Sequence, residues 1–378
     1  MGAVGMLRIA AGVLAGAMVI GAAPTASASV VAGADTWQGG LDSLVAAGAT
    51  SAIAELRQDG RTVWRGGAGV SELGSGRPVA EQGRFRIGSV TKPFVATIVL
   101  QLVGEGRLAL SDTVEQHLPG LLPGGAGVTV RRLLNHTSGL ADFTKHPDLA
   151  FTDEESIRRW VAEGRWDGYQ PRELAALAAA MPVRFQPGER WEYSNTNYVI
   201  ASMLVEQVTG HRWEQEVRDR IVRPLGLQHT DFPRDSARIS GPHAHAYFDL
   251  PEGPADVTEF NPSAVGAAGS GLSTTADLNR FQSALLGGEL LRPAEQAELL
   301  RTETVRPGVG YGLGLQRMDS PCGPLWGHTG STKGFQTAMV GTADGRRQVS
   351  VSYVPYDHTK GAVQQKALMG LLVGSLCA

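Results

Sequence analysis

The sequence predicts an α+β fold in which an antiparallel sheet is built from both ends of the mature chain, with a mainly helical region between them. β-prone runs cluster near both ends, whereas helical spacing of apolar residues dominates the middle. The 378 residues are 42% hydrophobic and 19% charged, which is typical of a globular protein with a sizeable core. We therefore expect one composite unit with a cleft where the sheet meets the helical region.

Four β-prone runs form two predicted hairpins, one near each end of the mature chain. Turn residues lie in the middle of each hairpin, as Asp59-Gly60 in the first and Asp344-Gly345 in the second. The runs cover residues 51–57, 62–67, 336–342 and 348–354. A helical pattern over residues 361–376 follows the second hairpin.

The middle of the chain has helical spacing, interrupted by loops that contain Gly and Pro. The expected helices cover residues 93–104, 172–181, 196–209, 213–221 and 275–286. We place the helical insert at approximately residues 105–265 of a single domain of residues 29–378. No internal repeat or low-complexity linker divides this domain.

The first residues have the features of a secretory signal peptide. Arg8 precedes an apolar run over residues 9–23 and a small-residue site, Ala26-Ser27-Ala28. We expect cleavage near Ala28 and an extracellular mature protein. The alternative is a membrane anchor, but the run is short and no Cys follows that could carry a lipid.

Charge and composition exclude several classes of partner. The formal net charge of -3 leaves no excess of Lys and Arg to neutralise a nucleic acid or to hold an anionic membrane. Asp and Glu do not cluster with His at the spacing of metal ligands, so we expect no metal and no cofactor. We expect a monomer that acts on a small substrate.

Cys322 and Cys377 are the two cysteines of the chain, and both lie in the exported part, where the compartment permits a disulfide. We expect them to be bridged, which would tie the last helix to the loop before Trp326-Gly327-His328. The alternative is two buried thiols.

Ser89 and Lys92 are a candidate nucleophile and base. If a helix begins at about Ser89, positions three apart share a face, and Pro93 is tolerated in a first turn. A lysine whose pKa is lowered by burial or by a neighbouring cation can take the proton of a serine hydroxyl. Alone, the Ser-x-x-Lys spacing is better explained by a capping serine and a solvated lysine.

Two further segments carry candidate polar groups. In Tyr193-Ser194-Asn195, the Tyr hydroxyl could relay a proton and the Asn amide could hold a substrate carbonyl, although a packed Tyr and a helix cap are the simpler alternatives. In His328-Thr329-Gly330, a Gly at a strand edge would let an extended substrate approach the backbone, and one N–H from this strand would complete an oxyanion hole with that of Ser89.

The order of these three elements, Ser-x-x-Lys, Tyr-Ser-Asn and His-Thr-Gly, resembles that of the penicillin-recognising serine hydrolases, which include DD-peptidases, class C β-lactamases and related esterases. The stretches VTVRRLLNHTSGL (128–140), PGERWEYSNTNY (187–198) and GLSTTADLNRF (271–281) are also similar to the framework of this family. The resemblance implies a β-lactamase/transpeptidase-like fold with the active site between the sheet and the helical region.

The resemblance also implies roles for individual residues. Ser89 would be the acylated nucleophile, Lys92 its general base and Tyr193 the proton relay, with Asn195 bound to a substrate amide. The segment His328, Thr329, Gly330 and Ser331 would line the substrate, and the N–H groups of Ser89 and Ser331 would form the oxyanion hole. A His at position 328 and the cysteine pair resemble the secreted D-alanyl-D-alanine carboxypeptidases more than the class C β-lactamases, which usually carry Lys there.

One position departs from that branch. An Arg that commonly follows the GYGLGL-type segment is thought to hold the substrate's terminal carboxylate, and here the position is Gln316, with Arg317 next. On a strand Arg317 would point to the other side. The prominent His136 is either a second general base or, as we expect, a loop residue that orders the cleft wall.

The sequence therefore predicts a secreted serine hydrolase that forms a covalent acyl-enzyme, with D-alanyl-D-alanine carboxypeptidase activity as the first hypothesis. Hydrolysis of a β-lactam or of a small ester is the alternative, and a non-catalytic peptide-binding or cell-wall-binding protein is a further one. Because an unperturbed imidazole titrates near pH 6.5, His328 leads us to expect that affinity for an anionic substrate falls as the pH rises through that region.

Overall fold

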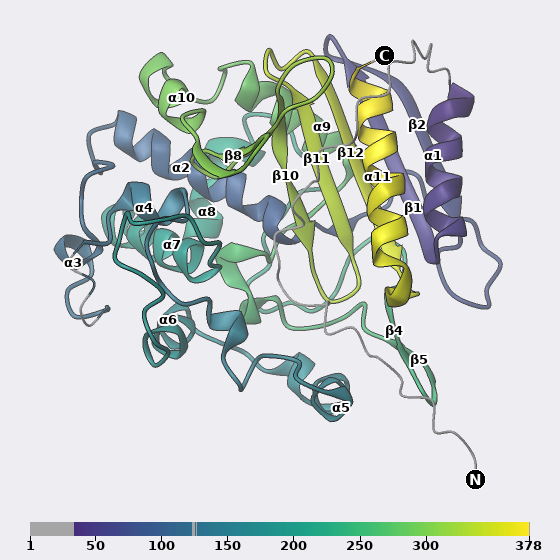
Figure 1. Cartoon of the computed structure of the whole chain (residues 1–378), viewed down its shortest axis with the longest axis horizontal. Coiled ribbons are helices and arrows are strands. Elements are labelled where there is room, and N and C mark those ends of the chain that lie inside the picture. Colours follow the sequence, from purple (N-terminus) through teal and green to yellow (C-terminus); the bar gives the residue numbers. More distant parts are fainter. Residues whose placement is uncertain (1–33, 123–124, 126, 378) are drawn as a thin grey trace.

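The computed structural model describes residues 34–122, 125 and 127–377. The expected signal peptide of residues 1–28 lies outside these described residues. Figure 1 shows the purple N-terminal strands next to the yellow-green C-terminal ones in one sheet, with helices on both of its faces. The predicted α+β fold, with an antiparallel sheet built from both ends, is confirmed.

The main sheet has eight strands in the order β2-β1-β12-β11-β10-β9-β8-β7, and its pairings are antiparallel. The strands are β1 (Ala49–Gln58), β2 (Arg61–Gly69), β7 (Glu303–Arg306), β8 (Val309–Tyr311), β9 (Gln316–Met318), β10 (Leu325–Ser331), β11 (Gln336–Thr342) and β12 (Arg347–Pro355). The four predicted runs lie in β1, β2, β11 and β12, and the bounds predicted for β11 are those observed.

The pairing of β1 with β12 joins the two ends of the chain. Ile53 lies opposite Ser352 and Leu56 opposite Val349 in this ladder. The adjacent β1–β2 turn has φ of 49° at Asp59 and 78° at Gly60, the positive pair that a two-residue type I′ hairpin requires.

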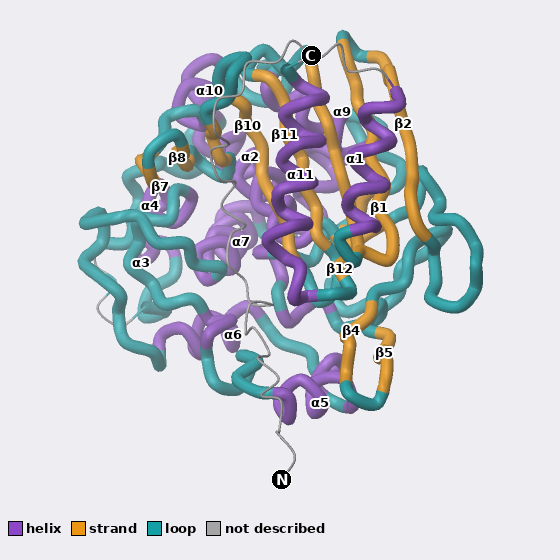
Figure 2. The backbone as a smooth tube through the Cα atoms, turned by 45° about the vertical axis from the view of Figure 1, so that its right-hand side comes forward, coloured by secondary structure: helices purple, strands orange, loops and turns teal. Residues whose placement is uncertain are grey.

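Two terminal helices, α1 (Ala34–Ala46) and α11 (Gly361–Leu376), lie side by side over one face of the sheet (Figures 1 and 2). Leu44 of α1 and Leu372 of α11 are completely buried, in one hydrophobic cluster with Val349 and Val351 of β12. Burial of each such leucine contributes about 1.5–3 kcal/mol. The predicted helix over residues 361–376 is confirmed, whereas α1 was not predicted.

The opposite face of the sheet packs against α9 (Thr275–Leu286), which in turn contacts α2 (Thr91–Gly104). The rings of Phe94 and Phe281 stack there with centroids 3.6 Å apart, and both side chains are completely buried. The remaining α-helices are α3 (Val114–His117), α4 (Val130–Leu134), α5 (Glu154–Ala162), α6 (Pro171–Ala179), α7 (Thr196–Thr209), α8 (Trp213–Val217) and α10 (Pro293–Leu299). The predicted bounds of α7 and α9 are those observed, and α2 begins two residues before its predicted start.

Two short antiparallel pairs complete the fold. One pairs β3 (Phe85–Arg86) with β6 (Leu272–Ser273), and the other pairs β4 (Tyr247–Leu250) with β5 (Gly253–Asp256). Pairing with β6 places β3 directly before the turn that carries Ser89. None of the described helices has both the length and the apolar character needed to cross a bilayer.

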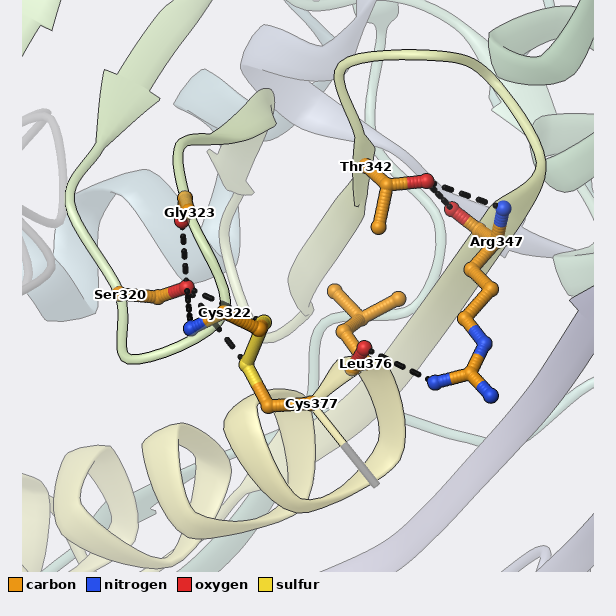
Figure 3. Close-up of a disulfide and its surroundings, with 7 residues drawn as sticks. All are labelled: Ser320, Cys322, Gly323, Thr342, Arg347, Leu376 and Cys377. Carbon is orange, nitrogen blue, oxygen red and sulfur yellow. Dashed lines mark hydrogen bonds between the residues drawn. A yellow bond between two sulfur atoms is a disulfide. The ribbon is translucent and has the colours of Figure 1, made fainter.

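The predicted disulfide between Cys322 and Cys377 is present (Figure 3). Its two Cα atoms are 5.2 Å apart, and the bond links positions separated by 55 residues. Ser320 Oγ donates a 2.6 Å hydrogen bond to the Gly323 carbonyl and so holds the loop beside the end of α11. Closing a loop of this length contributes about 2–4 kcal/mol by restricting the unfolded chain.

Candidate active site

Ser89 lies in a short 3₁₀ turn, η1 (Gly88–Val90), from which α2 continues. The sequence predicted a helix start here, and the structure divides it into this turn and an α-helix from Thr91. Gly88 has φ of 52°, and a Cβ built on it would be 2.8 Å from the backbone N of Ser331. Only glycine therefore allows the Ser89 turn to approach β10 this closely.

The predicted residues Ser89, Lys92 and Tyr193 meet at the serine hydroxyl. Both Lys92 Nζ and the Tyr193 hydroxyl donate to Ser89 Oγ, each at 2.9 Å. Lys92 Nζ also donates to Asn195 Oδ1 at 2.9 Å and to the Ala268 carbonyl at 2.6 Å. Because the Lys92 side chain is completely buried, these three acceptors fix the position of its amine.

Burial changes the acid–base properties of both partners of Ser89. It lowers the pKa of Lys92 to about 7, although the nearby Asp142 carboxylate acts in the opposite direction. A substantial fraction of the amine is therefore unprotonated near neutral pH. Burial raises the pKa of Tyr193 well above its usual value, so that its hydroxyl keeps its proton.

Asn195 occupies the N-cap position of α7, yet its side chain makes no capping hydrogen bond. Instead its Oδ1 accepts from Lys92, while its Nδ2 donates to Asp142 Oδ2 at 3.0 Å. The other Asp142 oxygen accepts from the backbone N and the hydroxyl of Thr144, at 3.1 and 2.9 Å. Asp142 thus sets which end of the Asn195 amide faces Lys92.

The segment of residues 328–331 forms the end of β10, next to the Ser89 turn. A Cβ on Gly330 would be 1.9 Å from the Ile87 carbonyl oxygen, so glycine is required at this contact. Ser331 Oγ accepts a 2.8 Å hydrogen bond from Gln336 Nε2 across the hairpin. The backbones of the Ser89 turn and of β10 are therefore side by side, as an oxyanion hole formed by the two would require.

The expected titration of His328 near pH 6.5 is wrong. Its side chain is buried, and burial, with the Lys92 charge nearby, lowers its pKa to about 3. Nε2 lies 2.9 Å from the Tyr311 hydroxyl and Nδ1 lies 2.5 Å from the Thr329 carbonyl oxygen. The ring is neutral from pH 5 to 8, so it supplies no titrating charge for an anionic substrate in this range.

His136 holds the wall behind Tyr193, in agreement with the structural role that we expected. Its Nδ1 accepts from the Ser194 backbone N at 3.2 Å, and its Nε2 lies 3.2 Å from the Tyr311 hydroxyl. Burial lowers the pKa of this completely buried ring well below the usual value. His136 and His328 therefore share Tyr311 as a partner.

Ser89 opens into a cavity of about 320 Å³, a size that suits a small ligand. The predicted site residues that line this cavity are Ser89, Tyr193, Asn195, Thr329 and Ser331. Gln316 is not among the described residues that line it. Its neighbour Arg317 forms an ion pair with Asp319, with 2.8 Å between nitrogen and oxygen.

Two notable residues of the site were missed by sequence reasoning. Asp142 lies two residues beyond the quoted stretch 128–140, and a lone acid in the apolar run SGLADF was the available signal. Lys333 follows the segment of residues 328–331 by two positions and was given no role, yet it lines the cavity and its Nζ lies over the Phe151 ring. Within the described residues, no cluster of three or more His, Cys, Asp or Glu could hold a metal ion.

The amino-acid sequence matches one family model and is similar to several known proteins. A family model described as Beta-lactamase matches residues 41–355. Penicillin-binding protein 4* from Bacillus subtilis (strain 168) is 29% identical over 294 residues, which cover 74% of this chain and 62% of that protein. Esterase EstB from Burkholderia gladioli is 31% identical over 301 residues, which cover 71% of this chain and 76% of the esterase.

A solved structure also resembles this chain over most of its length. The structure of a D-stereospecific amidohydrolase from Streptomyces sp. matches with a TM-score of 0.79 and 35% identity, covering 89% of this chain and 98% of that one. Three different activities are thus named among relatives of similar identity. The chain belongs to the Beta-lactamase family, a family of serine hydrolases.

Proposed function

We propose that this protein is a secreted serine hydrolase that forms an acyl-enzyme on Ser89 and cleaves the amide bond that follows a D-amino acid residue, with peptides ending in D-Ala-D-Ala as the first candidate substrates. The observation that carries the proposal is the placing of Lys92 Nζ and the Tyr193 hydroxyl, each 2.9 Å from Ser89 Oγ. This distance is within the range over which a proton is transferred directly.

In the proposed acylation step, unprotonated Lys92 takes the proton of Ser89 as Oγ attacks the substrate carbonyl carbon. The backbone N–H groups of Ser89 and Ser331 stabilise the negative charge that develops on the carbonyl oxygen. One Nδ2 hydrogen of Asn195 is engaged by Asp142, which leaves the other to bind an amide carbonyl of the substrate.

Acylation is completed when the carbon–nitrogen bond breaks and Tyr193 passes a proton from Lys92 to the departing amine. In deacylation, a water molecule attacks the acyl carbon and the same groups take its proton. The bond between the acyl carbon and Ser89 Oγ then breaks, Oγ regains that proton, and the acid product leaves. Tyr193 suits this role because burial keeps its hydroxyl protonated in the resting state.

The preference for D-amino acids is supported by the similar structure named a D-stereospecific amidohydrolase. Binding of penicillin is supported by the relative named a penicillin-binding protein. Ester hydrolysis is a second candidate because EstB has comparable identity to this chain. Export is supported by the Cys322–Cys377 disulfide, and we propose a monomer.

A direct test compares two diacetyl-lysyl dipeptides that end in D-Ala-D-Ala or in L-Ala-L-Ala, with D-alaninamide as a third substrate. We expect release of D-alanine from the D,D peptide and none of L-alanine from its twin. Turnover of D-alaninamide alone would replace the carboxypeptidase by an amino-acid amidase. Hydrolysis of p-nitrophenyl acetate without cleavage of any amide would favour the esterase, and no turnover at all would leave a binding protein.

Asp142→Asn is expected to lower kcat/KM by about 10–100-fold and to move the acid limb of its pH profile to lower pH. The NH₂ group introduced at position 142 would face Asn195 Nδ2, and two donors cannot form a hydrogen bond. The Asn195 amide would therefore turn, and Lys92 would lose Asn195 Oδ1 as an acceptor. Loss of the Asp142 charge also removes the attraction that raises the pKa of Lys92. Initial rates measured from about pH 5 to 9 check this prediction.

Asp277→Asn is the matched control for that variant. Asp277 is also a buried carboxylate, and it accepts from His229 N and the Thr230 hydroxyl at the start of α9. We expect this control to lower the melting temperature and to leave the pH profile unchanged. An unmoved acid limb in Asp142→Asn would show that Asp142 does not act on Lys92.

A further inference from the structure

Lys333 lies in the cavity wall, in the turn between β10 and β11. The turn is closed by hydrogen bonds from Thr332 N to the Phe335 carbonyl at 2.9 Å and from Gly334 N to the Thr332 carbonyl at 2.8 Å. The lysine side chain reaches across the cavity to the segment that contains α5. There Nζ is 3.2 Å from the ring centroid of Phe151 and 5.1 Å from that of Trp160.

Among the described residues, no carboxylate forms an ion pair with the ammonium group of Lys333. Its Nζ lies over the two aromatic rings instead. Burial lowers the pKa of Lys333 to about 7. Three acids, Asp148, Glu163 and Asp167, line the same cavity, but none of them forms an ion pair with Lys333 in the described part of the chain. A partly buried cation of this kind favours an anionic ligand.

The position of Lys333 relative to Ser89 indicates which part of a substrate it would meet. The leaving group must lie beside Tyr193 and Lys92, which supply its proton. The acyl part therefore occupies the rest of the cavity. Strand β9 pairs with β10 at Leu325, Trp326 and Gly327, at the end of β10 that lies away from Ser331. An acyl chain that follows β10 past Ser331 therefore reaches the turn with Lys333.

We propose that Lys333, Phe151 and Trp160 form a subsite for a carboxylate on the acyl part of the substrate. The ammonium pairs with the carboxylate, and the two rings contact the apolar atoms that carry it. This inference rests on the proposed function and narrows it to acyl groups that bear an acid, such as an N-succinyl or acidic-peptide derivative of a D-amino acid.

Two ligands that differ in one group test the subsite. N-succinyl-D-phenylalaninamide carries a carboxylate where N-succinamoyl-D-phenylalaninamide carries a neutral amide. Their dissociation constants are measured by calorimetry at about pH 6, on Ser89→Ala protein, which does not turn them over. We expect the acid to bind about tenfold more tightly or better, as a charge-assisted hydrogen bond implies.

Variants at position 333 then separate recognition from packing. Lys333→Met keeps the apolar stem and should make the two ligands bind equally, whereas Lys333→Arg should keep the preference for the acid. The exposed Lys145, outside the cavity lining, provides the matched control, because Lys145→Met removes the same charge and should leave the preference intact.

The results separate the subsite from the proposed function. Equal binding of the two ligands by the parent, no binding of either, or equal weakening of both by Lys333→Met would overturn the subsite and leave Lys333 as a clamp between the turn and α5. Ammonia release by wild-type protein reports the hydrolase independently. A protein that prefers the acid through Lys333 and releases no ammonia would keep the subsite and lose the proposed function.

Discussion

Ser89→Ala is expected to lower kcat/KM for every substrate of this protein by about 10⁴–10⁶-fold, the largest effect of any single substitution. Without Oγ no acyl-enzyme forms. Lys92 Nζ and the Tyr193 hydroxyl, which both bind that oxygen, then have no nucleophile to activate. Steady-state rates with a D,D peptide and with p-nitrophenyl acetate measure the loss.

Ser202→Ala provides the control for this substitution. Ser202 is a buried serine of α7 whose hydroxyl donates to the Val199 carbonyl at 2.7 Å within the same helix. It should retain wild-type activity. If Ser89→Ala kept more than about 1% of the wild-type kcat/KM, the reaction would not pass through an acyl group on Ser89.

Lys92→Met is expected to lower kcat/KM by about 10²–10⁴-fold, the usual contribution of a positioned general base. Lys92→Arg should be equally impaired, because a guanidinium stays charged and cannot accept the serine proton. In the wild type, the unprotonated amine is the active form and its pKa is lowered to about 7. The rate should therefore fall as the pH drops below about 7 and level off above it.

Lys366→Met is the matched control, since Lys366 is exposed on α11, the helix that covers the face of the sheet opposite to the one packed against α9. Its pH profile should be that of the wild type. If Lys92→Met kept the acid limb of the pH profile near pH 7, a group other than Lys92 would have to be the base. Melting temperatures establish that each variant is folded.

The sequence predicted the parts of the fold in which local pattern and final environment agree. The β11 and β12 runs are β-prone over their whole length, and α7 and α9 have clear capping or turn residues at their ends, so their positions follow from neighbouring residues alone. The short strands β7, β8 and β9 have three or four residues each and depend on the pairing partner. Such segments carry too little periodicity to be predicted.

The site residues that could be predicted from the sequence are likewise those that depend on nearby residues or on the order of motifs. Ser89 and Lys92 are three residues apart, so their meeting could be anticipated from a helix start, and the order of motifs brought in Tyr193 and Asn195. The charge state of His328 could not be anticipated, because it depends on complete burial and on Lys92 across the cleft. The contacts of Asp142 and Lys333 likewise join segments far apart in the chain.

The most direct test of the acyl-enzyme is the mass of the intact protein after acid quench, with benzylpenicillin and, separately, with the D,D peptide. A mass increase by one penicilloyl or peptidyl group is predicted, located on Ser89 by peptide mapping and absent from Ser89→Ala. Turnover of either compound without any adduct on Ser89, or an adduct on another residue, would contradict the mechanism.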